Sequence, residues 1–274
     1  MIGGSIGLAL KEKSPDTEIR VWARREAALS GITAAGFATM ASTSLDAVLR
    51  GAKLVVLCTP VEVMPDLAAL LLPPLDSDAL VTDAGSVKQV VLDAMVPVLK
   101  HQFIGAHPIA GSDRAGIEAA RADLYEGATC VVTPTSDSPR SAVERVTAFW
   151  KFLGCRVIEM SAAEHDARLA FTSHLPHVAA AALAMTVDRS APDWTDFVGG
   201  GFRDSTRIAA SNPDLWTGIL LANETSVTRS IAEMQEILQE FRVAVESRDA
   251  NTLRRLFAEA RTSRNRLNSD LDGI

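Results

Sequence analysis

The chain has 274 residues and a net charge of −7, so it can fold as one large domain or as two domains of ordinary size. Hydrophobic residues make up 47% of it and charged residues 22%, which is typical of soluble globular proteins and excludes a disordered or membrane-embedded chain. The acidic balance also argues against a nucleic-acid partner, because binding to phosphates requires clustered lysine and arginine.

Neither a membrane span nor a secretion signal is visible in the sequence. No segment has the roughly 20 uninterrupted apolar residues that cross a bilayer, and the amino terminus lacks the basic start and long apolar stretch of a signal peptide. The three cysteines, Cys58, Cys130 and Cys155, lie far apart in apolar runs, as buried thiols do. We therefore expect a soluble protein of the reducing cytoplasm, without a metal site.

Residues 1–13 begin with glycines and pass directly into a helical pattern. This is typical of the second half of a dinucleotide-binding turn, where the start of the helix faces the pyrophosphate. A complete G-x-G-x-x-G motif follows a strand, and Gly3 can only be its third glycine, so the first strand is expected to be missing. On this interpretation Gly3, Ser5 and Ile6 bind the cofactor; the alternative is a plain flexible terminus.

The next segment bears on the choice of cofactor. Residues 18–23 alternate as a strand and residues 24–29 start a helix, as in a βαβ unit. About 20 positions past the glycines, an acidic residue binds the ribose 2′-hydroxyl of NAD, whereas an arginine accepts the 2′-phosphate of NADP. Ala23 occupies this point and Arg24 and Arg25 follow, which favours NADP over NAD. The alternative is that two surface arginines simply open a helix.

Five apolar runs predict further strands, and helical patterns near 62–72, up to about 100 and at 141–152 separate most of them. This alternation predicts a Rossmann-like, mostly parallel sheet with helices on both faces. Thr59, Ser86 and His107 then fall at its carboxyl edge, where ligands bind in such sheets. We expect the cofactor to contact Thr59, Pro60, Val61 and Ser86. The predicted strands are 53–58, 79–83, 102–106, 129–133 and 156–159.

His107 is the first candidate for chemistry. It follows a short buried strand, and the chain after it breaks on proline and small residues, so the histidine lies where the strand passes into a loop. The alternative is a core histidine whose ring nitrogens bond to the backbone.

After about residue 160 the pattern becomes helical throughout. Apolar residues recur at helical spacing in 169–185, 215–238 and 244–267, without strand-like alternation. We therefore predict a dinucleotide-binding domain over 1–159 and an all-helical domain over 160–274. The glycines at 199–201 form a loop in which backbone can approach a ligand or another helix closely.

Four long motifs stand in register: DAGSVK at 83–88, FIGAHPIAGSD at 103–113, SHLPH at 173–177 and GGGFRDSTRIAASNPDLW at 199–216. Together they resemble the prephenate and arogenate dehydrogenase family of tyrosine biosynthesis. The match runs from Met1 to about Asn223 with similar gaps, and the remaining helices resemble the family's dimerisation domain in pattern.

The resemblance implies an NAD(P)-dependent oxidative decarboxylation of prephenate to 4-hydroxyphenylpyruvate, carried out by a homodimer. His107 matches the catalytic histidine, which accepts a hydrogen bond from the substrate hydroxyl near neutral pH. Ser86 matches a serine that bonds near the same hydroxyl; its alternative role is a helix N-cap, which is compatible.

The resemblance also implies how a doubly negative substrate is held. Arg207 matches an arginine that can grip a carboxylate with two hydrogen bonds. Arg203 is as easily a surface residue, and His174 as easily a structural one. The remaining expected substrate-binding residues are His177 near the substrate side chain, Asp204 as a residue that orients Arg207, Trp216 in the pocket wall or a dimer core, and Ser112.

Three other functions stay open at this point. The substrate can be arogenate, which carries an amino acid in place of the pyruvyl group. The chain can also be a dinucleotide-binding protein of the same fold without turnover, although His107, Ser86 and Arg207 together weigh against this. Lastly, β-hydroxyacid dehydrogenases and imine reductases share the layout, but they typically use a lysine in the helical part, and no lysine follows Lys151.

Overall fold

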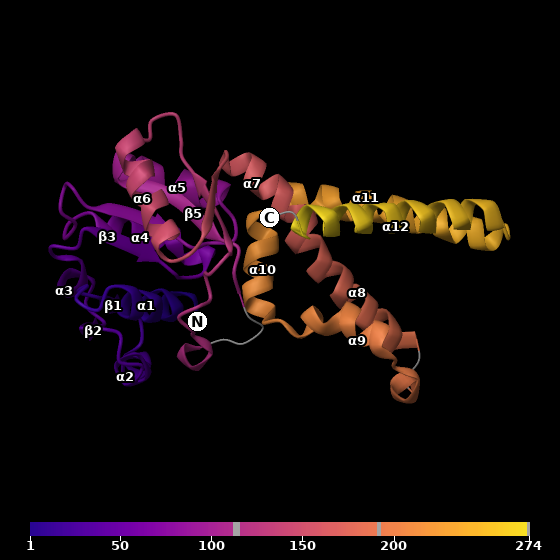
Figure 1. Cartoon of the computed structure of the whole chain (residues 1–274), viewed down its shortest axis with the longest axis horizontal. Helices are drawn as coiled ribbons and strands as arrows, with labels where there is room; N and C mark the ends of the chain where they lie inside the picture. Colours follow the sequence, from indigo (N-terminus) through magenta and orange to yellow (C-terminus); the bar gives the residue numbers. More distant parts are fainter. Residues whose placement is uncertain (112–115, 191–192, 273–274) are drawn as a thin grey trace. The chain divides into compact units, whose positions relative to one another are not determined.

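The structure is a computed structural model that describes residues 1–111, 116–190 and 193–272. Its residues pack into two compact units, Met1–Glu224 and Thr225–Ile274 (Figure 1). The first unit contains every strand of the described residues, together with helices α1 to α10. The second consists of two long helices.

A five-stranded sheet forms the centre of the first unit. Its strand order is β3-β4-β5-β6-β7, and all neighbours are parallel except β5 and β6. The mostly parallel sheet predicted from sequence is thus confirmed. The antiparallel pair was not predicted, because strand patterns carry no sign of direction and no α-helix separates β5 from β6 among the described residues. The strands are β3 Leu54–Leu57, β4 Leu80–Asp83, β5 Phe103–Pro108, β6 Thr129–Thr133 and β7 Arg156–Glu159.

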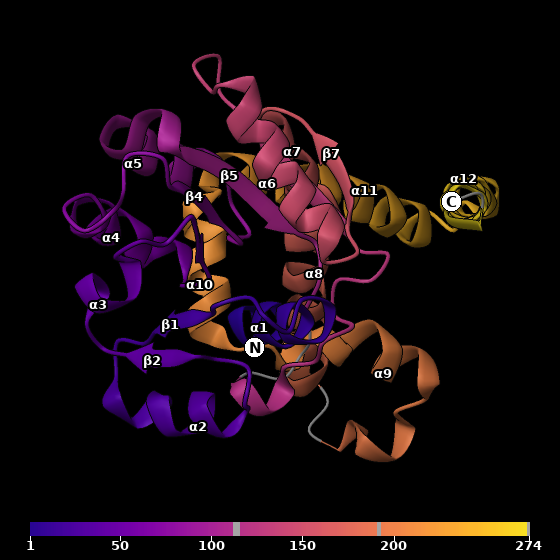
Figure 2. The ribbon, with the colours of Figure 1, turned by 60° about the vertical axis from the view of Figure 1, so that its left-hand side comes forward.

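Two short strands form a separate parallel pair, β1 (Arg20–Trp22) and β2 (Met40–Ser42). They lie next to helices α1 and α2 (Figure 2). Within the described ranges, no hydrogen-bonded strand joins β1 to β3. The sequence predicted β1 but not β2, whose few residues are not buried and leave no alternation to detect.

Helices cover both faces of the five-stranded sheet. Successive strand residues point to opposite faces, so Leu80 and Ile104 pack against α1 and α6, whereas Val81 and Phe103 pack against α4 and α5. The helices of this region are α1 Ile2–Lys13, α2 Leu29–Ala34, α3 Leu45–Leu49, α4 Met64–Leu71, α5 Gln89–Leu99 and α6 Arg140–Phe152. The three-layer arrangement is that of a dinucleotide-binding sheet.

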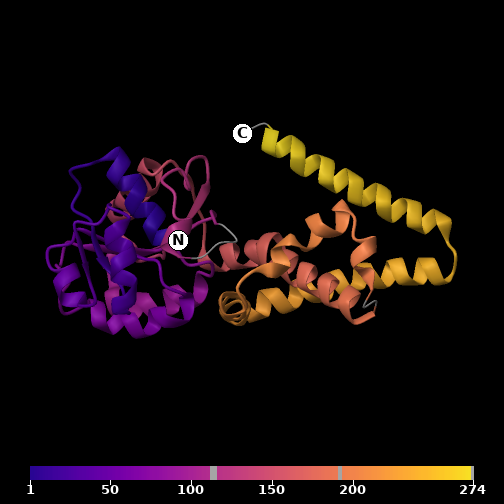
Figure 3. The ribbon, with the colours of Figure 1, turned by 90° about the horizontal axis from the view of Figure 1, so that it is seen from below.

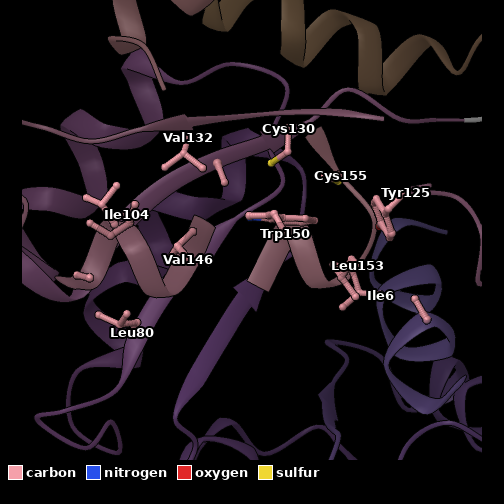
Figure 4. Packing of buried hydrophobic residues seen from close by; sticks show 14 of the residues in the cluster. Ile6, Leu80, Ile104, Tyr125, Cys130, Val132, Val146, Trp150, Leu153 and Cys155 are labelled. Carbon is pink, nitrogen blue, oxygen red and sulfur yellow. The ribbon is translucent and has the colours of Figure 1, made fainter. Parts of the chain in front are cut away.

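Trp150 of α6 is the largest fully buried side chain of the described residues (Figure 4). Its ring meets that of Tyr125 edge to face, with centroids 5.8 Å apart. The other buried residues of α6, Ala142, Val143 and Val146, recur at helical spacing on the same face. The opposite face of α6 is charged, and this contrast explains why its bounds could be predicted.

The chain after β7 is helical, as predicted. A π-helical turn, η5 (Ala170–His174), interrupts the first expected helix, and Asn223 breaks the second into α10 and α11. Apolar spacing alone could not locate these breaks, because they depend on side-chain hydrogen bonds described below. The helices are α7 Ala162–Leu169, α8 Leu175–Ser190, α9 Gly200–Thr206 and α10 Pro213–Ala222.

The second unit is a pair of helices, α11 (Glu224–Glu246) and α12 (Ala250–Asp272), which diverge from a tight turn (Figure 3). Phe241 and Phe257 pack edge to face near the turn, with ring centroids 5.4 Å apart. Asp249 caps α12 by accepting hydrogen bonds from the backbone amides of Asn251 and Thr252. None of the helices in the described part of the chain is long and apolar enough to cross a bilayer.

Helix α1 packs closely because its glycines have no side chains. A Cβ atom at Gly7 would lie 2.1 Å from the Phe37 ring, and one at Gly3 would lie 3.2 Å from the Cβ of Cys58. Phe37 is buried at 2% exposure, so its ring has no space into which to move. The glycines of α1 therefore determine how near the helix approaches its neighbours.

We predict that Gly7→Ala destabilises the protein by about 1–3 kcal/mol, because overpacking against Phe37 outweighs the better helix propensity of alanine. Gly201→Ala in α9 is the matched control, since a Cβ atom there meets nothing within 4 Å. The control should be neutral or stabilising by up to about 1 kcal/mol. Thermal unfolding of both variants measures the difference, and equal melting temperatures would contradict the prediction.

Candidate active site

Three parallel strands end at one edge of the sheet and bring the predicted turns together. Thr59 lies just past β3, Ser86 lies just past β4, and His107 lies at the end of β5. The expected placement of these residues at the carboxyl edge is confirmed. The edge is also where open parallel sheets bind ligands.

A buried ion pair fixes the turn after β4. Asp83 and Lys88 have no solvent exposure, and the Lys88 ammonium donates to the Asp83 carboxylate. The same ammonium donates to the carbonyl oxygen of Ala106 at 2.9 Å, and Asp83 accepts from the amides of Gly85 and Ala106 at 2.9 and 3.0 Å. The turn that carries Ser86 is therefore tied directly to the residue before His107.

Ser86 lies half-buried in this turn and does not cap the helix that follows. Helix α5 begins at Gln89, and its N-cap position, Lys88, makes no capping hydrogen bond through its own side chain. The alternative of Ser86 as an N-cap is therefore wrong. Its hydroxyl makes no hydrogen bond to any residue in the described ranges and can bond to a ligand.

His107 is buried at 8% exposure and bonds to a second histidine rather than to the backbone. Its Nδ1 atom lies 2.8 Å from Nε2 of His165, and the two rings meet edge to face. Burial lowers the pKa of His107 well below its ordinary value, and electrostatic interactions with His165, Lys88 and His174 lower it further. His107 is thus neutral near pH 7 and able to accept a proton.

Asp166 completes this chain of side chains. Its Oδ1 atom lies 2.7 Å from Nδ1 of His165. The carboxylate also accepts from the amides of Lys88 and Gln89, both at 2.8 Å, and so caps α5 from a distant part of the sequence. Its backbone carbonyl accepts from the side chain of Asn223 at 2.8 Å, which holds the start of the helical part in place.

His174 is almost completely buried at the end of the π-helical turn. Its Nδ1 atom lies 3.2 Å from the Asn223 amide nitrogen, and its Nε2 atom has no hydrogen-bond partner in the described residues. Burial lowers the pKa of His174 to about 4, with Asp166 opposing this and His165 and His177 adding to it. His174 is therefore also neutral near pH 7.

His177, one turn further along α8, stacks on Trp216 of α10. The ring centroids are 3.5 Å apart and the planes are 23° from parallel. The Nδ1 atom donates to the Ser173 carbonyl oxygen at 2.9 Å. Burial lowers the pKa of His177 and the nearby Arg207 guanidinium lowers it further, against the effect of the Ser173 bond. Arg207 thus lies within electrostatic reach of the stacked pair.

Trp216 is half-buried, so in this chain it serves as a platform for His177. Arg207 is exposed at the start of a short 3₁₀ turn, and Asp204 and Arg203 are exposed on α9. No ion pair joins Asp204 to Arg207, both of which the structure describes, so the expected orienting role of Asp204 has no contact behind it. Ser112 lies outside the described residues.

On the cofactor side, the start of α1 lies against the end of β3 at Gly3 and Cys58. The side chains of Ser5 and Ile6, two of the residues expected to bind the cofactor, are turned inward. Ser5 accepts from the Arg121 amide at 3.1 Å, and Ile6 belongs to the hydrophobic core. Of these residues, Gly3 alone keeps an amide in the first turn of the helix, where no intrahelical acceptor exists.

The three residues of the turn after β3 that were expected to contact the cofactor differ in burial. Val61 is buried in the core, Pro60 is exposed, and the buried hydroxyl of Thr59 has no hydrogen-bond partner in the described residues. Arg24 and Arg25 are exposed just past β1. An unsatisfied hydroxyl beside a glycine-lined helix start fits a dinucleotide. Among the described side chains, no group of three or more His, Cys, Asp or Glu residues could hold a metal ion.

His165, Asp166 and Asn223 were not predicted as site residues. They belong to none of the four motifs and lie far from His107 along the chain. The only sequence sign was a His-Asp pair at the start of a helix, which is not specific.

Comparisons with known proteins agree with this geometry. The family described as prephenate dehydrogenase, nucleotide-binding domain, matches residues 6–159, and the family described as prephenate dehydrogenase, dimerization domain, matches residues 161–259. A cyclohexadienyl dehydrogenase from Zymomonas mobilis is 33% identical, over 99% of this chain and 94% of its own length. A prephenate dehydrogenase from Bacillus subtilis is 35% identical, over 97% of this chain and 74% of its own length.

A solved structure extends the agreement to three dimensions. The prephenate dehydrogenase from Aquifex aeolicus, in complex with hydroxyphenyl propionate and NAD+, superposes with a TM-score of 0.91 at 30% identity, covering 97% of this chain and 94% of that one. Both family matches and the two relatives, which align with nearly all of this chain, confirm the resemblance seen in the four motifs. The chain belongs to the prephenate dehydrogenase family of NAD-dependent oxidoreductases.

Proposed function

We propose that this protein catalyses the oxidative decarboxylation of prephenate to 4-hydroxyphenylpyruvate in tyrosine biosynthesis. The observation that carries the proposal is His107, a buried and neutral histidine held through Nδ1 at the ligand-binding edge of the sheet, beside the turn of Ser86. A neutral imidazole in this place can take the proton of a substrate hydroxyl.

The reaction divides between His107 and the bound cofactor. The nicotinamide ring of a bound cofactor would supply the acceptor for the hydride that leaves C4. His107 takes the proton of the C4 hydroxyl on Nε2 as that oxygen becomes a carbonyl. The bond between the ring and its carboxylate then breaks and carbon dioxide departs. The electrons of that bond make the ring aromatic, and the C4 oxygen takes the proton back from His107, which regenerates the hydroxyl of the product. Aromatisation makes the sequence effectively irreversible.

Ser86 is proposed to hold the same hydroxyl from the other side. Its turn is fixed by the Asp83–Lys88 ion pair, which also bonds to the residue before His107. Because both groups are anchored to one network, we expect their separation to change little when the substrate enters. Positioning of this kind lowers the entropic part of the barrier.

Arg207, His177 and Trp216 are proposed to bind the substrate side chain. Arg207 is exposed and has no ion-pair partner in the described ranges, so its guanidinium can hold a carboxylate with two hydrogen bonds. The stacked rings of His177 and Trp216 give this side of the site a rigid wall.

The cofactor is proposed to lie between the start of α1 and the Thr59 hydroxyl, with a preference for NADP over NAD. Arg24 and Arg25, exposed just past β1, support this preference, because a guanidinium there can bind a 2′-phosphate.

Residues 1–159 would then bind the dinucleotide, and residues 160–274 would complete the substrate site and form a homodimer. The match to a dimerization domain supports the dimer, and we propose the cytoplasm as its location.

The first prediction concerns turnover. Purified protein given prephenate or arogenate with NADP or NAD should reduce the cofactor fastest with prephenate, as measured by the absorbance of reduced nicotinamide. His107→Asn should lower kcat by about 10²–10⁴-fold, because the proton acceptor is lost. Turnover of arogenate alone would assign the second substrate instead, and reduction in none of the pairings would refute the dehydrogenase.

The second prediction concerns substrate binding. Arg207→Gln should raise KM for prephenate about 10–100-fold with a smaller change in kcat, because it removes charge-assisted hydrogen bonds to a carboxylate. Arg189→Gln on the exposed end of α8 is the matched control and should leave KM unchanged. Steady-state kinetics that show equal KM values for the two variants would remove Arg207 from the site.

The third prediction concerns the cofactor. The double variant Arg24→Gln/Arg25→Gln should raise KM for NADP about tenfold and leave KM for NAD nearly unchanged, because only NADP carries the 2′-phosphate. NAD thus serves as the internal control in the same preparation. A wild-type enzyme that prefers NAD, or a variant that loses both cofactors equally, would contradict the assignment.

A further inference from the structure

A chain of two hydrogen bonds connects His107 to a carboxylate through a second histidine. His107 Nδ1 meets His165 Nε2 at 2.8 Å, and His165 Nδ1 meets Asp166 Oδ1 at 2.7 Å. The three residues are 8%, 0% and 4% exposed. Water therefore does not compete for these bonds, and every polar side-chain atom of the three residues must find its partner inside the protein.

The direction of both hydrogen bonds follows from the bonds that the Asp166 carboxylate accepts. The Asp166 carboxylate accepts from the backbone amides of Lys88 and Gln89, which can only donate. A carboxylate accepts from His165 as well, so a His165 ring with a single proton carries that proton on Nδ1. Its Nε2 atom then carries a lone pair and can only accept.

The same reasoning continues to His107. Because Nε2 of His165 accepts, the proton of neutral His107 must be on Nδ1, and the lone pair is on Nε2. The tautomer of His107 is thus determined by backbone amides at the start of α5, through Asp166 and His165. With the opposite tautomer, Nε2 would carry a hydrogen and could not accept the proton of a substrate hydroxyl.

We propose that His165 and Asp166 are positioning residues that hold His107 in the tautomer with its lone pair on Nε2. This inference rests on the proposed function, in which His107 takes the hydroxyl proton. Neither residue touches the substrate, and both act through His107.

Asp166 also makes hydrogen bonds that hold two parts of the backbone together. By capping α5 and accepting from Asn223 through its carbonyl oxygen, it fixes the start of the helical part to the turn that carries Ser86. The tautomer of His107 and the position of Ser86 are therefore set by the same carboxylate.

Two variants of His165 separate the inference from a merely structural role. In His165→Gln the side-chain oxygen reaches about as far as Nε2 and can still accept from His107. In His165→Asn the shorter amide reaches only the region of Nδ1, so it can bond to Asp166 but leaves His107 without an acceptor. Both changes replace the buried ring by a smaller amide and should lower the melting temperature to a similar degree.

We expect His165→Asn to lower kcat about 100-fold and to change KM for prephenate by less than about threefold. The reason is that His107 would then be protonated on the wrong nitrogen, whereas no contact to the substrate would be lost. His165→Gln should restore kcat to within about tenfold of the wild type. Asp166→Asn should lower kcat at least as much as His165→Asn, because it also disturbs the cap of α5. The double variant should be little worse than Asp166→Asn alone, since both residues act on one series of hydrogen bonds. Equal kcat values for the two His165 variants at similar stability would overturn the inference.

Nitrogen NMR of histidine-labelled protein tests the tautomer without turnover. The wild type should show His107 protonated on Nδ1, and His165→Asn should show the proton redistributed toward Nε2. A wild-type His107 protonated on Nε2 would overturn the inference, whatever the kinetics. A wild type that turns over neither prephenate nor arogenate would overturn the proposed function alone, because the NMR result decides the tautomer independently.

Discussion

The buried pair of Asp83 and Lys88 is the interaction on which the site depends most. It binds three pieces of backbone at once: the end of β4, the turn of Ser86 and the strand that carries His107. A charge with no solvent exposure is tolerated when it is paired and hydrogen-bonded, and here the pair also bonds to the Gly85 amide and to the amide and carbonyl groups of Ala106. Removing either partner would leave an uncompensated buried charge next to the turn that carries Ser86.

Asp166 does for the helical part what Asp83 does for the sheet. One carboxylate ties strands together within the sheet, and the other ties α7 to the start of α5. The two meet at Lys88, whose ammonium bonds to Asp83 and whose amide bonds to Asp166. The site is therefore assembled from both halves of the first unit through a single lysine. In a medium of low polarity such a network is rigid when complete and weak when one member is missing.

Sequence reasoning located what depends on local patterns. The strands at 129–133 and 156–159 have the bounds that were predicted, and the motif residues Ser86 and His107 lie at the expected edge of the sheet. It could not locate what depends on contacts between distant residues. His165 and Asp166 approach His107 only after the helical part folds back, and the inward turn of Ser5 depends on its bond to Arg121. No periodicity along the chain encodes these contacts.

The concentration of histidines explains how the site handles charge. Four of the five histidines of the chain, His107, His165, His174 and His177, lie in one connected group. Since burial lowers the pKa of His107 and His174, the unfolded chain binds more protons than the folded one below the ordinary histidine value. The contribution of these two histidines to stability is therefore fully present at pH values above the ordinary histidine pKa. It is lost as the pH falls toward their lowered pKa values in the folded protein. Because His107 and His174 stay neutral near pH 7, they add no positive charge for a substrate anion. In the proposed function that charge is met by Arg207, and His107 remains available to receive the hydroxyl proton.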